Sequence, residues 1–303
     1  MRERAQTQMT VGTAQFGMPY GINNSTGMPS PHEISRIVHR AIEHGVTSFD
    51  TARSYGESEL RLGEALAGGW HHRATVITKL APIEDGSGTA VRAAVETSVI
   101  ESCRALRVDR LDVLLLHRAH NLRSVGGAVW ERLLQFKAAG MVGRLGVSVQ
   151  NRDELALAEA DPHVEVIQLP FNLLDRRWAG RSTTRGDLEV HVRSVFLQGL
   201  LIGAPADRWP RMPRLDPEAM LSVLKDLVGD LGRASLSDLA IAFVRAHGWV
   251  DSLVIGVETD AQLADNLRLF ANRPLDAAEV ELVRQRVPAA PETLLDPAQW
   301  RTH

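Results

Sequence analysis

Short apolar runs alternate with longer amphipathic segments along this chain, and the alternation constrains the fold more than any other sequence feature. Eight runs are predicted to be β-strands because they are short, rich in β-branched and aliphatic residues, and bounded by polar or turn-forming residues. They are TVGTAQF (10–16), VTSFDTA (46–52), ATVITKL (74–80), LDVLLLH (111–117), VGRLGVSV (142–149), VEVIQLPFN (164–172), LEVHVRSVF (188–196) and SLVIGV (252–257). Since these runs are nearly continuous in apolar residues, both faces of each strand are expected to be buried, as in a parallel sheet.

The amphipathic segments between the strands are predicted to be helices. The first of them follows Ser30, has Pro31 at its first position and ends at Gly45, which are typical signals for helix ends. The pattern is weakest in the segment DRRWAGRSTTRG (175–186). The predicted helices cover residues 31–45, 58–68, 90–107, 129–140, 152–160, 175–186, 217–232, 235–248 and 259–270.

Eight strand–helix steps in one chain predict an α/β fold, a (β/α)8 TIM barrel whose active site lies at the carboxyl ends of its strands. The alternative is a doubly wound open sheet, which normally carries a glycine-rich fingerprint after its first strand. The segment GTAQFG (12–17) does not match G-x-G-x-x-G, so the barrel is favoured. The 303 residues suit a single domain over 1–303, with 1–9 and 287–303 as terminal extensions.

Charge and composition argue against several classes of function. The formal net charge is −3, whereas nucleic-acid-binding proteins are normally basic, so no nucleic-acid partner is expected. The short basic cluster DRR (175–177) is interpreted as part of a solvated loop. A polar start and the lack of an apolar run of about 18 residues predict neither a secretory signal nor a membrane span, so a cytoplasmic location is expected. The single cysteine, Cys103, excludes an intrachain disulfide and is expected in the core.

Ionisable side chains close three consecutive predicted strands. Asp50 lies near the end of the second strand with Tyr55 five residues further on, Lys79 lies at the end of the third, and His117 ends the fourth. Lys79 is one of three lysines among 34 basic residues, and a charge at the end of an apolar strand needs a reason. Because the carboxyl ends of the strands meet at one face of a barrel, these side chains are expected to lie together.

Together these residues predict a proton-transfer site. A tyrosine has a pKa of about 10, and a nearby ammonium group such as that of Lys79 lowers it. Asp50 would keep the buried lysine charged, and His117 would donate a hydrogen bond to an oxygen beside the tyrosine. Such a tyrosine serves as general acid for a carbonyl oxygen or general base for an alcohol. No nucleophile–base pair and no metal-binding set is recognisable, so the chemistry requires a partner that carries electrons.

The motifs around these residues resemble those of the aldo-keto reductases, in the same order along the chain. GVTSFDTARSYGESELRLGEAL (45–66) resembles the family segment with the aspartate and tyrosine, TKL (78–80) its lysine strand, and LLLH (114–117) its histidine strand. Its cofactor-contacting segments are resembled by GVSV (146–149), QLPFN (168–172) and VIGVETDAQLADNL (254–267). The resemblance implies a barrel that binds NADP(H) without a Rossmann domain. It also implies an oxidoreductase that acts on the CH–OH group of donors, with a small carbonyl or alcohol substrate.

The resemblance also implies a role for individual residues. Tyr55 would be the general acid/base, Lys79 would tune its pKa, Asp50 would pair with Lys79, and His117 would orient the carbonyl group. The residues implied in cofactor binding are Thr13, Ala14, Asp50, Ser148, Gln168, Arg193, Ser194, Phe196, Leu197, Gly199, Gly256, Glu258, Thr259, Gln262 and Asn266.

The cofactor residues are divided by the resemblance between two ends of one molecule. Ser148 and Gln168 would bind the amide of the nicotinamide. The adenosine end would lie around the helix predicted from Thr259, where the free N–H groups of a helix start favour phosphate.

Three positions depart from the family pattern. Arg193 stands where many members stack an aromatic ring on the nicotinamide, and its planar guanidinium is expected to contact the cofactor or the substrate. Val149 replaces an asparagine, so that one amide contact is either lost or supplied by Gln150 or Asn151. Glu258 lies near the position where many members hold the 2′-phosphate with a basic residue, and an acid there would accept from a 2′-hydroxyl instead. NAD(H) is therefore the alternative to NADP(H).

Two other functions remain open at this stage. A barrel that binds the cofactor to sense redox state, or to interact with another protein, would keep the same site with little turnover. Metal-dependent hydrolysis is suggested only by His117 and His120 in HRAH (117–120), and no third ligand at a recognisable spacing accompanies them.

Overall fold

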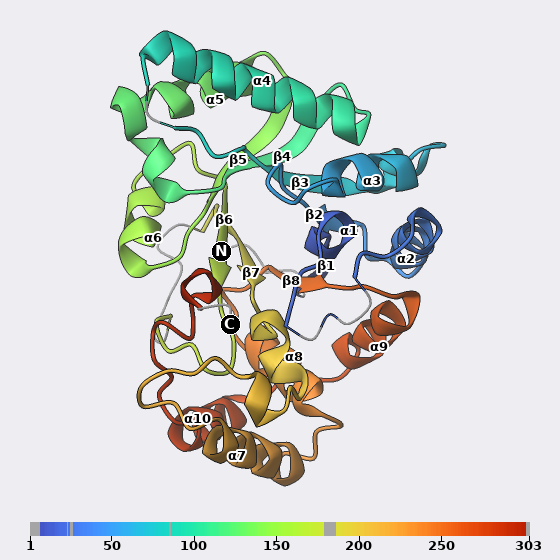
Figure 1. The fold of residues 1–303 in the computed structure, drawn as a ribbon, viewed down its shortest axis with the longest axis vertical. Coiled ribbons are helices and arrows are strands. Elements are labelled where there is room, and N and C mark those ends of the chain that lie inside the picture. Colours follow the sequence, from blue (N-terminus) through green and yellow to red (C-terminus); the bar gives the residue numbers. More distant parts are fainter. Residues whose placement is uncertain (1–6, 23, 25–26, 85, 179–185, 301–303) are drawn as a thin grey trace.

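The computed structural model describes residues 7–22, 24, 27–84, 86–178 and 186–300. Eight parallel strands close into a barrel in the order of the sequence, and β8 pairs with β1 (Figure 1). The strands are β1 (Gln8–Gly12), β2 (Ser48–Asp50), β3 (Thr75–Lys79), β4 (Leu111–Leu116), β5 (Val142–Ser148), β6 (Val166–Pro170), β7 (Glu189–Arg193) and β8 (Ser252–Gly256). The prediction of a (β/α)8 barrel is confirmed, and the closed order excludes the open sheet.

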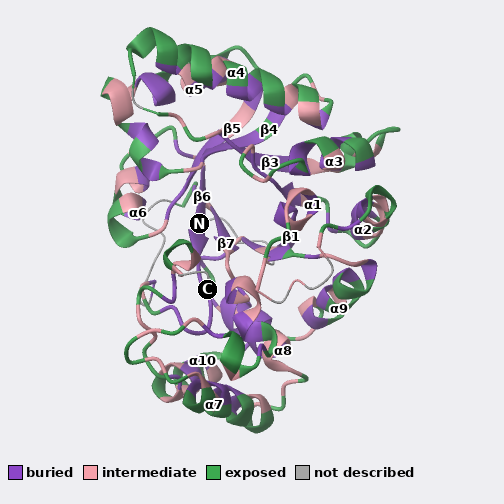
Figure 2. Ribbon diagram, viewed as in Figure 1, coloured by how far each residue is buried: buried purple, intermediate pink, exposed green. Residues whose placement is uncertain are grey.

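Helices surround the barrel, and most of them have an exposed and a buried side (Figure 2). In α2, Pro31 occupies the first turn, Ser30 accepts a hydrogen bond from the N–H of Glu33, and an apolar stripe that includes Ile34 and Val38 is buried. The described residues contain no helix that is long and apolar enough to cross a membrane. The α-helices are α1 (Ala14–Gly17), α2 (Pro31–Glu43), α3 (Ser58–Ala65), α4 (Gly88–Leu106), α5 (Ala128–Ala138), α6 (Arg152–Glu159), α7 (Pro217–Asp230), α8 (Leu236–Arg245), α9 (Asp260–Phe270) and α10 (Ala277–Arg286).

Two predicted elements differ from the structure. The strand predicted over 10–16 is divided, because β1 ends at Gly12 and the next residues form α1, whose Phe16 is fully buried. The helix predicted over 175–186 is not seen at 175–178, where the chain makes a turn, and residues 179–185 lie outside the described part. Cys103, expected in the core, is only partly buried at the edge of the core.

Two stretches of regular structure lie where none was predicted. No element was predicted for residues 277–286, which form α10, and the start of β1 lies in the expected N-terminal extension. Asp276 and Glu279 form a capping box at the start of α10, and the spacing D-x-x-E in the sequence is the signal that would have predicted it. β1 begins at Gln8, two residues inside the expected N-terminal extension.

The interior of the barrel consists of an apolar layer below a polar one. The apolar layer is a buried cluster distinct from the main core, and it comprises Ile77, Val113, Leu115 and Val166. Side chains alternate between the two faces of a strand, so Lys79 and Gln168, each two residues further along, point to the same interior. The polar layer therefore lies at the carboxyl end of the barrel, directly above the apolar layer.

Candidate active site

The strand ends bring an ion pair together inside the mouth of the barrel. Asp50 is the last residue of β2 and Lys79 the last residue of β3, and they are only 3% and 1% exposed. Lys79 Nζ donates to Asp50 Oδ1 at 2.6 Å and to the carbonyl oxygen of Thr51 at 2.9 Å. Burial acts to lower the pKa of Lys79, but the charge and hydrogen bond of Asp50, together with Tyr55, raise it. The lysine is therefore a fixed positive charge at neutral pH.

Tyr55 and His117 lie beside this ion pair. The turn after β2 carries Tyr55, and Lys79 Nζ is 5.0 Å from the centroid of its ring. The ring of His117, which follows β4 directly, meets the ring of Tyr55 edge-on with 6.0 Å between centroids. All four residues that the sequence predicted as a catalytic set thus come together at one point of the barrel mouth.

The ring of His117 is uncharged at neutral pH. Burial lowers its pKa from 6.5 to about 4, and the charges of Lys79 and Arg193 act in the same direction. Its Nδ1 lies 3.2 Å from the hydroxyl oxygen of Ser54. A neutral imidazole keeps one N–H group, so the side chain is able to donate a hydrogen bond to an oxygen without adding a charge to the site.

Hydroxyl groups and a close backbone contact hold the turn that carries Tyr55. Thr13, at the end of β1, donates from its hydroxyl to the carbonyl oxygen of Asp50 at 2.9 Å, and Ser58 donates to the carbonyl oxygen of Thr13 at 2.7 Å. A β-carbon at Gly17 would lie 1.9 Å from the carbonyl oxygen of Tyr55. Only glycine allows α1 to pack this closely against the turn, and the turn is thereby held in one place.

Gln168 supplies an unsatisfied buried acceptor next to the ion pair. Its Nε2 donates to Asp50 Oδ2 at 2.7 Å, whereas its Oε1 is buried and has no hydrogen-bond partner within the described part of the chain. In the β5–β6 pairing Gln168 lies opposite Ser148. Buried polar atoms without partners are rare in folded proteins, so this oxygen marks a place where a ligand donor fits.

A cavity of about 1090 Å³ begins at these groups and runs to the start of α9. All but one of the residues predicted for catalysis or cofactor binding line it. The exception is Thr259, whose hydroxyl accepts from the N–H of Gln262 and caps α9. The lining residues from the predicted set are Thr13, Ala14, Asp50, Tyr55, Lys79, His117, Ser148, Gln168, Arg193, Ser194, Phe196, Leu197, Gly199, Gly256, Glu258, Gln262 and Asn266.

Arg193 ends β7, and its guanidinium group is held by Gln150. Its Nη2 donates to Gln150 Oε1 at 2.7 Å and to the carbonyl oxygen of Val149 at 3.4 Å. No carboxylate of the described residues lies within ion-pair distance of this guanidinium. Asn151 is occupied elsewhere, because its side chain caps α6. Gln150 and Asn151 were the two residues considered as substitutes for the asparagine that Val149 replaces. Only Gln150 lines the cavity, and its Oε1 atom accepts a hydrogen bond from Arg193.

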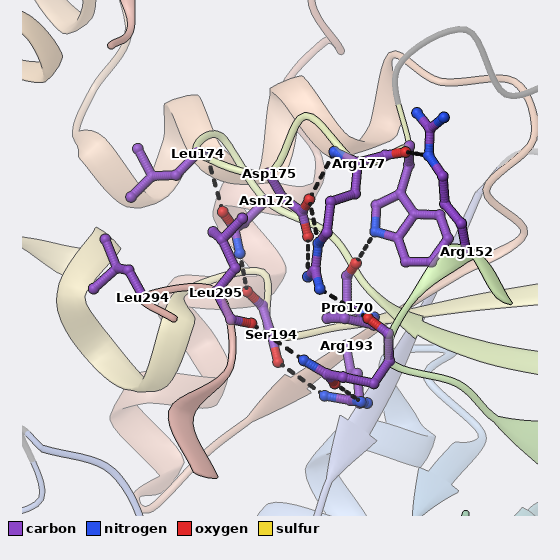
Figure 3. A network of polar contacts seen from close by, with 12 residues as sticks. Arg152, Pro170, Asn172, Leu174, Asp175, Arg177, Arg193, Ser194, Leu294 and Leu295 are labelled. Atoms are coloured by element: carbon purple, nitrogen blue, oxygen red, sulfur yellow. Dashed lines mark hydrogen bonds and ion pairs between the residues drawn. The ribbon is translucent and has the colours of Figure 1, made fainter. Parts of the chain in front are cut away.

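The cluster DRR (175–177) is not the solvated loop that the sequence suggested. Asp175 is 3% exposed and forms an ion pair with Arg177, and Arg177 Nη1 also donates to the carbonyl oxygen of Gln150 at 2.8 Å (Figure 3). A short charged run is expected to be solvent-exposed, whereas here only Arg176 is exposed, and the paired Arg177 supports the residue that holds Arg193.

The sequence analysis did not identify several residues that line the mouth of the cavity. They include Tyr20, Gln198 and Ile202, together with the C-terminal residues 296–298. The C-terminal segment is anchored by Leu294 and Leu295, which are 0% and 3% exposed. An apolar pair in a polar tail was the available signal that this segment docks against the barrel.

The first turn of α9 is rich in carboxylates. The N–H of Asp260 donates to Glu33 Oε1 at 2.7 Å, and Arg36 and Arg40 both pair with the carboxylate of Asp260. Glu258 lies just before the helix, and burial raises the pKa of its carboxyl group. The N–H groups of residues 260 and 262 are therefore bound by the chain's own side chains, contrary to the expectation that they stand free for a phosphate.

His117 and His120 were also considered as metal ligands. Within the ranges that the structure describes, no group of three or more His, Cys, Asp and Glu side chains is arranged to hold a metal ion. A metal site would require at least three protein ligands.

Known proteins match this chain over most of its length. A family model described as "Aldo/keto reductase family" matches residues 8–287. The chain is 25% identical to the "Uncharacterized oxidoreductase YcsN" of Bacillus subtilis (strain 168), over 72% of this chain and 76% of that protein. It is 26% identical to "Deoxymugineic acid synthase 1" of Hordeum vulgare, over 83% of this chain and 82% of that protein.

Solved structures share the barrel. The aldo-keto reductase AKR11C1 from Bacillus halodurans, in its holo form, superposes with a TM-score of 0.77 at 21% identity, covering 95% of this chain and 96% of that chain. The glycerol dehydrogenase AKR11B4 from Gluconobacter oxydans superposes with a TM-score of 0.70 at 21% identity, covering 95% and 94%. At this identity the two structures establish a common fold.

Proposed function

Because the chain belongs to the aldo/keto reductase family, we propose that it interconverts a small aldehyde or ketone and the corresponding alcohol, with Tyr55 as general acid and base. The observation that carries the proposal is the buried Asp50–Lys79 pair, whose ammonium group lies 5.0 Å from the centroid of the Tyr55 ring in the same cavity as His117. A phenol, a fixed cation and a neutral imidazole suit proton transfer to a carbonyl oxygen.

Each residue of the set has one task in the proposed reaction. The nicotinamide cofactor, when bound, supplies or accepts the hydride. Tyr55 gives its phenolic proton to the carbonyl oxygen, and the positive charge of Lys79 stabilises the negative charge that the phenol oxygen then carries. Asp50 keeps that charge in place despite its burial. His117, as a neutral donor, orients the carbonyl oxygen towards Tyr55.

The residues at the floor of the cavity fit a nicotinamide ring. The Oε1 atom of Gln168 lacks a donor, and a carboxamide carries two N–H donors. Ser148, opposite Gln168 on the neighbouring strand, offers a hydroxyl group for the other side of such an amide. Thr13 and Ala14 line the same floor at the end of β1.

The loop after β7 fits the charged middle of a dinucleotide. Ser194, Leu197 and Gln198 have φ angles of 60°, 46° and 53°, a left-handed backbone conformation that is uncommon outside glycine. Such strained residues cluster at ligand-binding sites. We assign this loop, with Phe196 and Gly199, to the diphosphate.

The start of α9 fits NAD(H) better than NADP(H). Glu258 lines the cavity at the position proposed for the adenosine ribose, and a carboxylate there repels a 2′-phosphate but accepts a hydrogen bond from a 2′-hydroxyl. Arg268 also lines this end, and it lies 3.6 Å from the carboxylate of Asp265. Gln262 and Asn266 remain as neutral contacts. We therefore propose NAD(H) as the cofactor.

Cofactor titration followed by a substrate screen tests this proposal. Fluorescence titration is expected to give a Kd for NADH at least about tenfold below that for NADPH, which corresponds to about 1.4 kcal/mol. The tighter cofactor is then mixed with a panel of aldehydes and ketones, and its oxidation is followed by absorbance. Tighter binding of NADPH would contradict the assignment of NAD(H). Tight binding without turnover of any carbonyl compound would favour a cofactor-sensing or interaction protein instead.

The pKa of His117 predicts a specific acid sensitivity. The pKa is about 4 in the folded protein and about 6.5 in the unfolded chain, so only the unfolded state takes up this proton between those values. The free energy of unfolding therefore falls as the pH drops through that window. Between pH 7 and pH 5 the wild type is expected to lose roughly 1–2 kcal/mol more than His117→Gln, as measured by urea unfolding at both values. Equal losses in the two proteins would contradict a neutral, partly buried His117.

A further inference from the structure

One end of the cavity contains Tyr55 and His117, and we call it the reacting end. The charges around it affect the binding of oxidised and reduced nicotinamide differently. Hydride transfer requires the reacting atoms to approach to about 3–3.5 Å. With the carbonyl group held at Tyr55 and His117, the nicotinamide ring must lie at this same end of the cavity. The ring carries one positive charge when oxidised and none when reduced, so the surrounding charges act on one form and not on the other.

Arg193 is the uncompensated charge at this end. The charge of Lys79 is balanced by Asp50 at 2.6 Å, and His117 is neutral. Arg193 has no carboxylate partner among the residues described, and its charge acts on the titration of Tyr20, Lys79 and His117 alike. These three side chains come from different segments of the barrel mouth, so the field of Arg193 reaches the whole reacting end.

Other carboxylates near Arg193 are engaged elsewhere. Glu154 lines the cavity, but its Oε2 accepts from the N–H of Gln150 at 2.6 Å. Asp296 also lines the cavity and caps the turn that follows it in the C-terminal segment. Neither forms an ion pair with Arg193. The exposed Arg118 adds a further positive charge, so that three cations, Lys79, Arg193 and Arg118, and one anion, Asp50, act on His117.

We propose that Arg193 makes this site bind the reduced nicotinamide more tightly than the oxidised one and so favours loading of the reduced cofactor and release of the oxidised one. The inference rests on the proposed function. In the reduction, the C4–H bond of the reduced ring breaks and its electron pair forms a C–H bond at the carbonyl carbon, while the proton of Tyr55 passes to the oxygen. The ring thereby gains a positive charge beside Arg193, which favours release of the oxidised cofactor.

Gln150 is the positioning residue for Arg193. It accepts from Arg193 through Oε1, its Nε2 donates to the carbonyl oxygen of Leu295 at 3.4 Å, and its own carbonyl oxygen accepts from Arg177 (Figure 3). The amide is neutral, so it fixes the guanidinium without cancelling its charge. A glutamate of the same shape would keep the contact and neutralise the charge, which separates the effect of charge from that of position.

Binding of the two redox forms tests the proposal without any turnover. The Kd of reduced and of oxidised cofactor is measured by fluorescence for the wild type, Arg193→Gln, Arg193→Lys and Gln150→Glu. The control is Arg92→Gln, which removes one positive charge from the surface of α4, where Arg92 lies 3.6 Å from Glu131. We expect the wild type to bind the reduced form at least about tenfold more tightly. The measured quantity is the ratio of the Kd of the oxidised form to the Kd of the reduced form. Arg193→Gln and Gln150→Glu should each lower this ratio about fivefold or more, while Arg193→Lys and Arg92→Gln keep it within about twofold.

Three results would overturn the proposal. In the first, the ratio is unchanged in both Arg193→Gln and Gln150→Glu. In the second, Arg193→Gln weakens both redox forms equally, which makes Arg193 a simple anchor. In the third, Arg193→Gln leaves the ratio unchanged but raises KM for aldehydes that carry a carboxylate and for no others, which makes Arg193 a substrate-binding residue. A wild type that binds neither redox form would instead refute the proposed function itself, and Gln150→Glu keeps the test decisive if Arg193→Gln does not fold.

Discussion

Tyr55→Phe is expected to lower kcat for carbonyl reduction by about 10²- to 10⁴-fold, the range typical of a lost general acid. The substitution removes one oxygen and its proton and leaves the ring, so the edge-on contact with His117 and the packing above Lys79 are retained. The Kd of the reduced cofactor should stay within about twofold, because the phenolic proton acts on the carbonyl oxygen and not on the cofactor. Steady-state rates and fluorescence titration on the same preparation measure both quantities.

The chain provides its own control, since Tyr20 is the only other tyrosine. It lines the mouth of the same cavity, is 37% exposed, and accepts a hydrogen bond from Gln198 at 3.4 Å. Among the described residues no hydrogen bond or ion pair joins Tyr20 to Asp50 or Lys79, so Tyr20→Phe should reduce kcat less than about tenfold, within the range of a lost weak hydrogen bond. Equal losses in Tyr55→Phe and Tyr20→Phe would mean that neither phenol is the general acid.

The barrel was predictable because its signal repeats and is set by local physics. Each buried parallel strand needs an apolar run, and each crossover needs an amphipathic helix, so the same pattern recurs eight times along the sequence. The prediction was wrong where a local pattern was ambiguous. TVGTAQF (10–16) is apolar throughout, and only the packing of Phe16 shows that its second half is helical. DRR (175–177) was expected to be solvated because the sequence does not show that Asp175 is buried and pairs with Arg177; only the fold shows it.

The site was predictable to the extent that it sits at strand ends. Asp50, Lys79 and His117 each interrupt or end an apolar run, and barrel geometry brings such positions to one face. Contacts between distant segments were not predictable. Gln150 joins Arg193 to the C-terminal segment through Leu295, and no spacing in the sequence connects those residues. The carboxylates that occupy the first turn of α9 come partly from Glu33 on α2, which lies more than 200 positions away in the chain.

Lys79→Met is expected to lower both stability and activity, and the two losses have different causes. The lysine is 1% exposed, and its removal leaves the carboxylate of Asp50 buried without its cation. Breaking a buried ion pair from one side typically costs about 3–5 kcal/mol of the free energy of unfolding. Urea unfolding measures this loss, and Lys225→Met, at an exposed position of α7, should stay within about 0.5 kcal/mol of the wild type.

The double variant Asp50→Asn/Lys79→Met separates structure from catalysis. It removes both charges, and replacing a buried pair entirely is far less costly than removing one partner. The double variant should therefore regain at least about 2 kcal/mol of the stability that Lys79→Met loses. Its kcat should nevertheless remain at least about 10²-fold below that of the wild type, since the ammonium group beside the Tyr55 ring is absent from both variants. If activity returned together with stability, Lys79 would serve only to balance Asp50, and the proton transfer at Tyr55 would need another source of positive charge.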